Sequence, residues 1–185
     1  MIPHMSAPAE LLRDFVNTYD VEGGMDDLAT PAELTVWLRE RGLIDPAARA
    51  VDRDLAVAVR LREGLRVTLR HNHDAVMADA SPELAWALAA LPLHVTLVQG
   101  VPGLAPSLTG VPGGLARIAA LISASHADGS WPRLKVCVEG TCQWAFIDSS
   151  KNRSRAWCSM RVCGNRTKTR TYRARRQAEG SARPS

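Results

Sequence analysis

Residues 137–163 read Cys137-Val-Glu-Gly-Thr-Cys142-Gln-Trp-Ala-Phe-Ile-Asp-Ser-Ser-Lys-Asn-Arg-Ser-Arg-Ala-Trp-Cys158-Ser-Met-Arg-Val-Cys163 and hold all four cysteines of the 185-residue chain. The cysteines form two pairs, each with four residues inside it, and fifteen residues separate the pairs. This spacing is typical of a structural zinc site, in which four thiolates surround one ion. We therefore predict Zn bound by all four cysteines, with a short hairpin between the pairs.

Two disulfides are the alternative for the same cysteines. The N-terminal Met1-Ile-Pro-His4 shows neither the basic nor the apolar segment of an export signal, so we expect a cytoplasmic protein whose thiols stay reduced. A segment below about 40 residues seldom folds without a disulfide, a bound metal or a partner chain. Structural zinc contributes on the order of 10–16 kcal/mol of apparent binding free energy. The metal is thus expected to replace a core, beside a small apolar cluster of Trp144, Phe146, Ile147 and Trp157.

The residues from Cys142 to Met160, followed by Cys163-Gly-Asn-Arg-Thr-Lys168, closely resemble the CGNR zinc finger over about forty-five residues. In that family the finger usually follows an ABATE domain, found in stress-induced transcription regulators. Phe15-Val-Asn-Thr18 resembles the opening of that domain. Asn17 has two interpretations: it satisfies backbone groups at a helix end, or it binds a ligand. The resemblance implies a stress-responsive regulator of bacterial transcription.

The charge distribution agrees with two domains of different character. Residues 1–130 hold ten Lys or Arg and sixteen Asp or Glu, whereas residues 131–185 hold thirteen and three, giving balances of −6 and +10. Such a reversal indicates a polyanion-binding segment attached to an ordinary domain. We predict an ABATE-like helical domain over 1–128, a CGNR zinc finger over 131–178 and a disordered tail over 179–185.

A basic helix is predicted to follow Cys163. At 100° per residue, Arg166, Arg170 and Arg173 fall within about 60° of one another, and Lys168 and Arg175 flank Tyr172 on the other side. Arginine can form bidentate hydrogen bonds with a phosphate group or with the acceptor edge of guanine. The predicted nucleic-acid contacts are Arg153, Arg155, Arg166, Lys168, Arg170, Arg173, Arg175 and Arg176. Asn165 is expected to hold the metal loop through backbone hydrogen bonds.

Apolar periodicity and capping signals predict the N-terminal helices. The expected ranges are 8–20, 30–42, a long helix from Asp45-Pro46 to about residue 73, 81–91 and 115–127. Alternation predicts a strand at 93–98 that returns through 105–108, and the glycines and prolines of 100–114 argue against a helix there. The expected fold is mainly α: an N-terminal helical array with a small β-hairpin, then a treble-clef-like zinc finger made of a hairpin and a basic helix.

Five arginines lie on the long helix among acidic residues, a pattern typical of a solvated face. They are Arg53, Arg60, Arg62, Arg66 and Arg70. The alternative is that some of these arginines line a small anionic pocket. A deep pocket lined by Arg60, Arg66 or Trp37 would support a small-molecule effector site in the N-terminal domain. His71-Asn72-His73 is explained by the preference of helix ends for cationic groups.

No catalytic set is apparent, so we expect a non-enzymatic role. The longest apolar run, 84–98, has fifteen residues interrupted by Pro92 and is too short to cross a bilayer, so no membrane partner is expected. DNA is the predicted partner, and RNA or an acidic protein partner is the alternative. Further partners allowed by the sequence are a small effector and a second copy in a homodimer.

Overall fold

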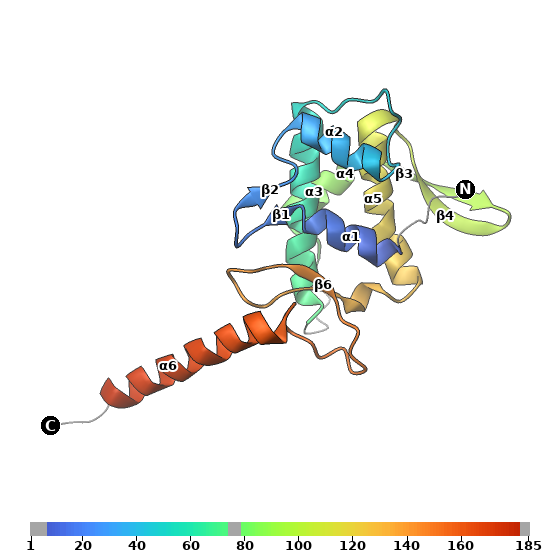
Figure 1. Cartoon of the computed structure of the whole chain (residues 1–185). Coiled ribbons are helices and arrows are strands. Elements are labelled where there is room, and N and C mark those ends of the chain that lie inside the picture. The colour runs from blue at the N-terminus through green and yellow to red at the C-terminus, as the bar shows by residue number, and fades with distance from the viewer. Residues whose placement is uncertain (1–6, 74–78, 182–185) are drawn as a thin grey trace.

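The computed structural model describes residues 7–73 and 79–181 and shows a mainly α fold, as predicted (Figure 1). The helices of the N-terminal part are α1 (Pro8–Val16), α2 (Pro31–Glu40), α3 (Asp52–His71), α4 (Pro82–Ala89) and α5 (Gly110–Ala127). In the described part no helix is long and apolar enough to span a bilayer. Helices α1 to α5 confirm the predicted N-terminal helical array.

The core forms where α1, α2 and α5 pack around α3. Leu61, Leu65 and Leu69 follow one another at the four-residue spacing of a helix face and are fully buried. Phe15 of α1 packs against Trp37 of α2 with ring centroids 5.4 Å apart. The predicted apolar faces of these helices thus meet in one continuous core.

α2 begins as its sequence predicts, but α3 does not. The Thr30 side chain accepts a hydrogen bond from the Glu33 amide at the start of α2. The chain after Asp45-Pro46 is instead tied to α2, because the Ala50 amide donates to the Thr35 hydroxyl at 2.8 Å. α3 starts only at Asp52, so the predicted helix start at Asp45-Pro46 is wrong.

α5 starts at Gly110, inside the segment for which a helix was excluded, so that prediction is wrong for 110–114. Proline is tolerated in the first turn of a helix, which accounts for Pro112. A Cβ on Gly113 would lie 2.4 Å from the Leu108 carbonyl oxygen, and one on Gly114 would lie 2.5 Å from Ile44 Cγ2. These glycines therefore permit close packing at the start of α5.

The predicted hairpin is present as β3 (Leu93–Val98) paired antiparallel with β4 (Val101–Pro106). A second, unpredicted hairpin joins β1 (Tyr19–Asp20) to β2 (Met25–Asp26) around the turn that contains Gly23. The β1–β2 pairing places Asp26 beside α3.

Two arginines of α3 are buried and do not form part of a solvated face. Arg62 is 3 % exposed and binds both carboxylate oxygens of Asp26, at 2.6 and 2.9 Å. Arg66 is 4 % exposed and donates to the carbonyl oxygens of Val16 and Tyr19. The prediction of a solvated face is wrong for these two, whereas Arg53, Arg60 and Arg70 are exposed.

The finger hairpin lies around the first cysteine pair and not between the two pairs as expected. β5 (Leu134–Val136) pairs antiparallel with β6 (Ala145–Ile147), and the turn between them carries Cys137 and Cys142. Leu134, Val136 and Ala145 belong to the same buried cluster as the N-terminal helices. The finger therefore shares the main core, which corrects the expectation that metal alone replaces a core here.

A 3₁₀ turn at Trp131–Arg133 precedes β5. The last helix, α6 (Asn165–Ser181), directly follows a π-helical turn at Met160–Gly164. Figure 1 shows α6 projecting from the rest of the molecule. The disordered tail predicted for 179–185 overlaps the end of α6, which reaches Ser181, and 182–185 lie outside the described residues.

Candidate metal centre and nucleic-acid interface

The structure brings the four cysteines into one cluster. All four Sγ atoms lie within 4.8 Å of one another, with Cys142 3.6 Å from Cys158 and Cys158 3.7 Å from Cys163. Disulfide sulfurs would be about 2.05 Å apart. Four sulfurs held about 2.3 Å from a tetrahedral ion are about 3.8 Å apart, so the cluster fits one tetrahedral metal ion. The four cysteines form a metal site.

Burial determines the electrostatics of this cluster. Cys137, Cys142 and Cys163 are buried, and Cys158 is partly buried. Burial, followed by hydrogen bonding with Cys142, raises the pKa of the Cys163 thiol to about 11, and the same two causes raise the pKa of the Cys158 thiol. Thiolates in such a site need a bound cation to hold their charge. The nearby N-terminus of α6 adds a favourable helix dipole.

Arg155 and Asn165 order the second cysteine pair from its two sides. The Arg155 guanidinium donates to the Trp157 carbonyl at 2.8 Å and to the Cys158 carbonyl. Asn165 donates from its side-chain amide to the Arg161 carbonyl at 3.0 Å. The Asn165 contact with a backbone carbonyl is of the kind expected for a structural role. Arg155 was predicted to contact nucleic acid, but its guanidinium is bound inside the finger.

Glu139, which the sequence reasoning missed, fastens the first cysteine turn to α6. Its carboxylate accepts from both terminal nitrogens of Arg170, at 3.0 and 2.9 Å, and from the Thr167 hydroxyl at 3.0 Å. The Arg170 hydrogen bond is the main reason that the pKa of Glu139 falls to about 2. An acidic residue in the first turn, opposite Thr167 and Arg170 at helical spacing, is the sequence signal that could have indicated this clamp.

The eight predicted nucleic-acid contacts divide into two groups. Three of them bind other parts of the chain. Arg155 donates to the Trp157 carbonyl. Arg166 pairs with Glu22 at 2.8 Å, and Arg170 pairs with Glu139 at 2.9 Å. The other five are exposed, and no hydrogen bond or ion pair of their side chains is seen within 7–73 and 79–181: Arg153, Lys168, Arg173, Arg175 and Arg176. We call these five the free cations.

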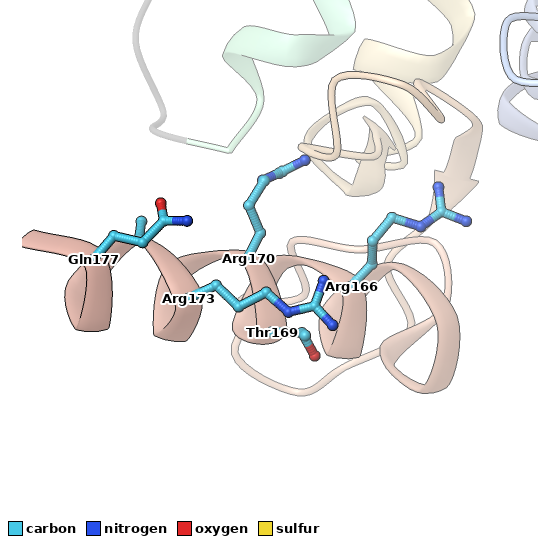
Figure 2. A pocket seen from close by; sticks show the side chains of 6 residues that line it. Arg166, Thr169, Arg170, Arg173 and Gln177 are labelled. Carbon is cyan, nitrogen blue, oxygen red and sulfur yellow. The ribbon is translucent and has the colours of Figure 1, made fainter.

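One face of α6 carries a shallow depression of about 510 Å³. Figure 2 shows Arg166, Arg170 and Arg173 on this face, together with Thr169 and Gln177. The predicted angular grouping of the three arginines is thus seen. Arg166 and Arg170 are paired with Glu22 and Glu139, whereas Arg173 forms no ion pair within the described ranges.

Asn17, Arg66 and Arg166 are among the residues that fasten the finger to the N-terminal domain. The Asn17 side chain donates to the Ala145 carbonyl at 2.9 Å and accepts from the Ala145 amide at 2.8 Å. Arg66 donates to the Gln143 carbonyl at 2.9 Å, and Arg166 reaches Glu22. Asn17 therefore satisfies backbone groups, which was one of its two interpretations. These backbone groups belong to Ala145 of the finger and not to the end of its own helix.

The residues expected to line an effector pocket are engaged elsewhere. Trp37 is 6 % exposed and lies in the core, and the Arg60 guanidinium stacks 4.2 Å from the Trp86 ring centroid. Arg66 is occupied by three backbone carbonyls. These groups stabilise the domain and do not form the predicted pocket.

Comparison with protein families agrees with this architecture. Residues 133–176 match the CGNR zinc finger model. Residues 9–129, well over half of the chain, match the ABATE model, described as "putative stress-induced transcription regulator". Among curated proteins, none matches this chain. The chain therefore belongs to the ABATE family, and a CGNR zinc finger follows its ABATE domain.

Proposed function

We propose that this protein is a zinc-dependent DNA-binding transcription regulator whose finger presents the free cations of α6 to duplex DNA. The observation that carries the proposal is a set of four exposed cations on α6 whose side chains form no hydrogen bond or ion pair among the described residues: Lys168, Arg173, Arg175 and Arg176. They lie on a helix fastened to a metal site. The family description adds transcription regulation under stress as the setting.

Zinc is the metal that fits this donor set best, because four cysteine sulfurs at tetrahedral spacing are typical of structural zinc sites. The ion would be held by Cys137, Cys142, Cys158 and Cys163, and its chemistry is to fix the two cysteine turns. Four protein ligands leave no open coordination position. The proposed role is therefore binding and not catalysis.

The free cations suit a phosphate backbone. Each one that neutralises a phosphate releases counterions, so five contacts give a slope of log affinity against log salt of about −4.5. Affinity would then fall several hundredfold between roughly 50 and 200 mM salt. The planar fork of arginine can also bind phosphate or guanine in two places.

One observation favours RNA as a second candidate. Tyr172 is 61 % exposed on α6, and the Arg176 guanidinium lies 5.8 Å from its ring centroid. Exposed aromatic and arginine planes are used to stack unpaired bases. Single-stranded RNA is therefore the competitor that the test must include.

An electrophoretic mobility shift with the zinc-loaded full chain tests the proposal. We expect a retarded complex with duplex DNA at low salt that is lost on chelation and in Cys158→Ser, which removes one ligand. Thr169→Ser, an exposed change on α6, is the matched control and should bind as the wild type does. Absence of a duplex complex, together with retention of single-stranded RNA, would replace DNA by RNA as the partner.

A further inference from the structure

A cleft of about 700 Å³ lies where the N-terminal domain meets the finger. We call it the junction cleft. It is lined by His71 from the end of α3, Leu84 and Leu88 from α4, Ile122 from α5, Trp131, and Arg153 from the finger. Small-molecule sites occur preferentially at domain interfaces and commonly measure about 300–1,000 Å³. Its size and place therefore suit a small ligand.

The wall of the junction cleft is apolar and aromatic. Leu84 is 4 % exposed, and Leu88 and Ile122 are partly buried. The Trp131 ring stacks on the His126 ring with centroids 4.8 Å apart and an interplanar angle of 24°. A flat hydrocarbon body would gain contact area against this wall.

Among the described residues, the ionisable groups that line the junction cleft are all bases. His71, His73, His126 and Arg153 contribute to its lining, and no carboxylate does so among the described residues. His73 is used by a contact of 2.6 Å with the Val136 carbonyl. In contrast, His71 Nδ1 is buried and has no hydrogen-bond partner within the described ranges. The cleft therefore offers polar groups suited to an anion.

The backbone of Arg153 is held in a defined conformation at the edge of the junction cleft. It has a φ of 51°, a left-handed conformation that is uncommon outside glycine. The buried Lys135 donates to the Arg153 carbonyl and to Asp148, at 3.0 Å for Asp148, which fixes this turn. A residue whose uncommon backbone conformation is supported by its surroundings is a candidate for ligand binding.

We propose that the junction cleft binds a small organic carboxylate with a flat aromatic body. The body packs on Trp131 and Leu88, and the carboxylate meets Arg153 and His71. Such a ligand contacts both domains at once, so its binding ties the finger loop to α3 and α4. This inference concerns a different surface from α6. It shares Arg153 with the proposed DNA contacts, but ligand binding at the cleft does not depend on DNA binding.

Isothermal titration calorimetry of the zinc-loaded full chain tests this proposal with 1-naphthoate as the probe. The neutral 1-naphthamide and the cationic 1-naphthylmethylammonium are its matched controls. We expect saturable binding of 1-naphthoate at one site per chain, and affinities at least about tenfold weaker for both controls, as expected when a charge-assisted hydrogen bond is lost.

Two variants assign the site. Arg153→Gln removes the cation at the surface and should weaken 1-naphthoate about tenfold or more, whereas Lys151→Gln, in the same loop and outside the cleft lining, should not. Leu88→Trp fills the cleft and should abolish binding, with zinc content serving as the check on folding. The proposal is overturned by absence of saturable 1-naphthoate binding, by equal affinity for the ammonium probe, or by full affinity in either Arg153→Gln or Leu88→Trp.

Discussion

Asn17 links the two domains through the backbone of a single residue, Ala145. It pairs with both the amide and the carbonyl of Ala145, a residue with no exposed surface. Asn17→Ala would leave a buried donor and a buried acceptor unpaired, at about 1–3 kcal/mol each. We expect the free energy of unfolding in urea to fall by about 2–6 kcal/mol.

Asn152→Ala is the matched control for this change, because Asn152 is exposed and its side chain forms no hydrogen bond among the described residues, so stability should change little. Unfolding is to be measured at neutral pH with zinc in excess. An effect of Asn17→Ala within about 0.5 kcal/mol, as at an ordinary surface site, would contradict the link.

The Asp26–Arg62 pair makes stability depend on pH. Burial raises the pKa of Asp26, but the hydrogen bonds from Arg62 and the Leu28 amide, with the charges of Arg62 and Arg66, outweigh it and hold the pKa below its ordinary value of 3.8. A depressed carboxyl pKa stabilises the fold above the unfolded-state value, and this stabilisation is lost as pH falls through the folded-state value.

Urea unfolding of the wild type and Asp26→Asn from neutral pH to below 3.8 tests this dependence. The variant should be less stable by about 1–3 kcal/mol near neutral pH, a charged hydrogen-bond value reduced because Asp26 is partly exposed. The difference should shrink as the pH falls below 3.8. A difference that is constant across this range would contradict the assigned pKa.

At the scale of elements, α6 is held at one end only. Arg166 and Thr167 are partly buried, and every residue from 168 to 177 is exposed. Polar helices without a buried face are marginal in water, so the Glu139 clamp and the metal site stabilise the first turns alone. We expect amide hydrogen exchange to be slow around 167–171 and fast around 173–177, with protection of the second range on adding DNA. Equal protection along α6 in the free protein would contradict this view.

Elements with strong local signals were predictable, and those set by distant contacts were not. The cap of α2 and the alternation of β3 are readable in a few adjacent residues. The start of α5 depends on glycines that fit against Leu108 and Ile44, and the start of α3 depends on a contact with Thr35. Such partners are not visible in a local pattern.

The candidate site shows the same division. Ligand spacing alone indicated the four-cysteine cluster that the structure brings together. The partners of the arginines were not predictable, because Arg166 binds Glu22 in the other domain and Arg170 binds Glu139 across the finger. Charge and spacing show which arginines share a face, but they do not show which of them are neutralised inside the fold.

At the scale of the whole molecule, one core serves both domains. Because β5 and β6 pack into the N-terminal core, metal removal should free only the cysteine turns and α6. We expect chelation to give fast hydrogen exchange at 137–142 and 158–177, while α3 and the β5–β6 hairpin remain protected. Loss of protection in α3 on chelation would show that the metal holds the whole chain together.

The most direct test of the central claim is the salt dependence of DNA affinity, measured by fluorescence anisotropy on one duplex. The variant replaces the α6 cations with glutamine, which has a similar helix propensity, at Lys168, Arg173, Arg175 and Arg176. The control carries four exposed N-terminal replacements by glutamine, at Arg49, Arg53, Arg60 and Arg70. The account predicts a slope of about −4.5 for the wild type and the control, and about −1 for the α6 variant. An unchanged slope in the α6 variant, or an equal loss in the control, would contradict it.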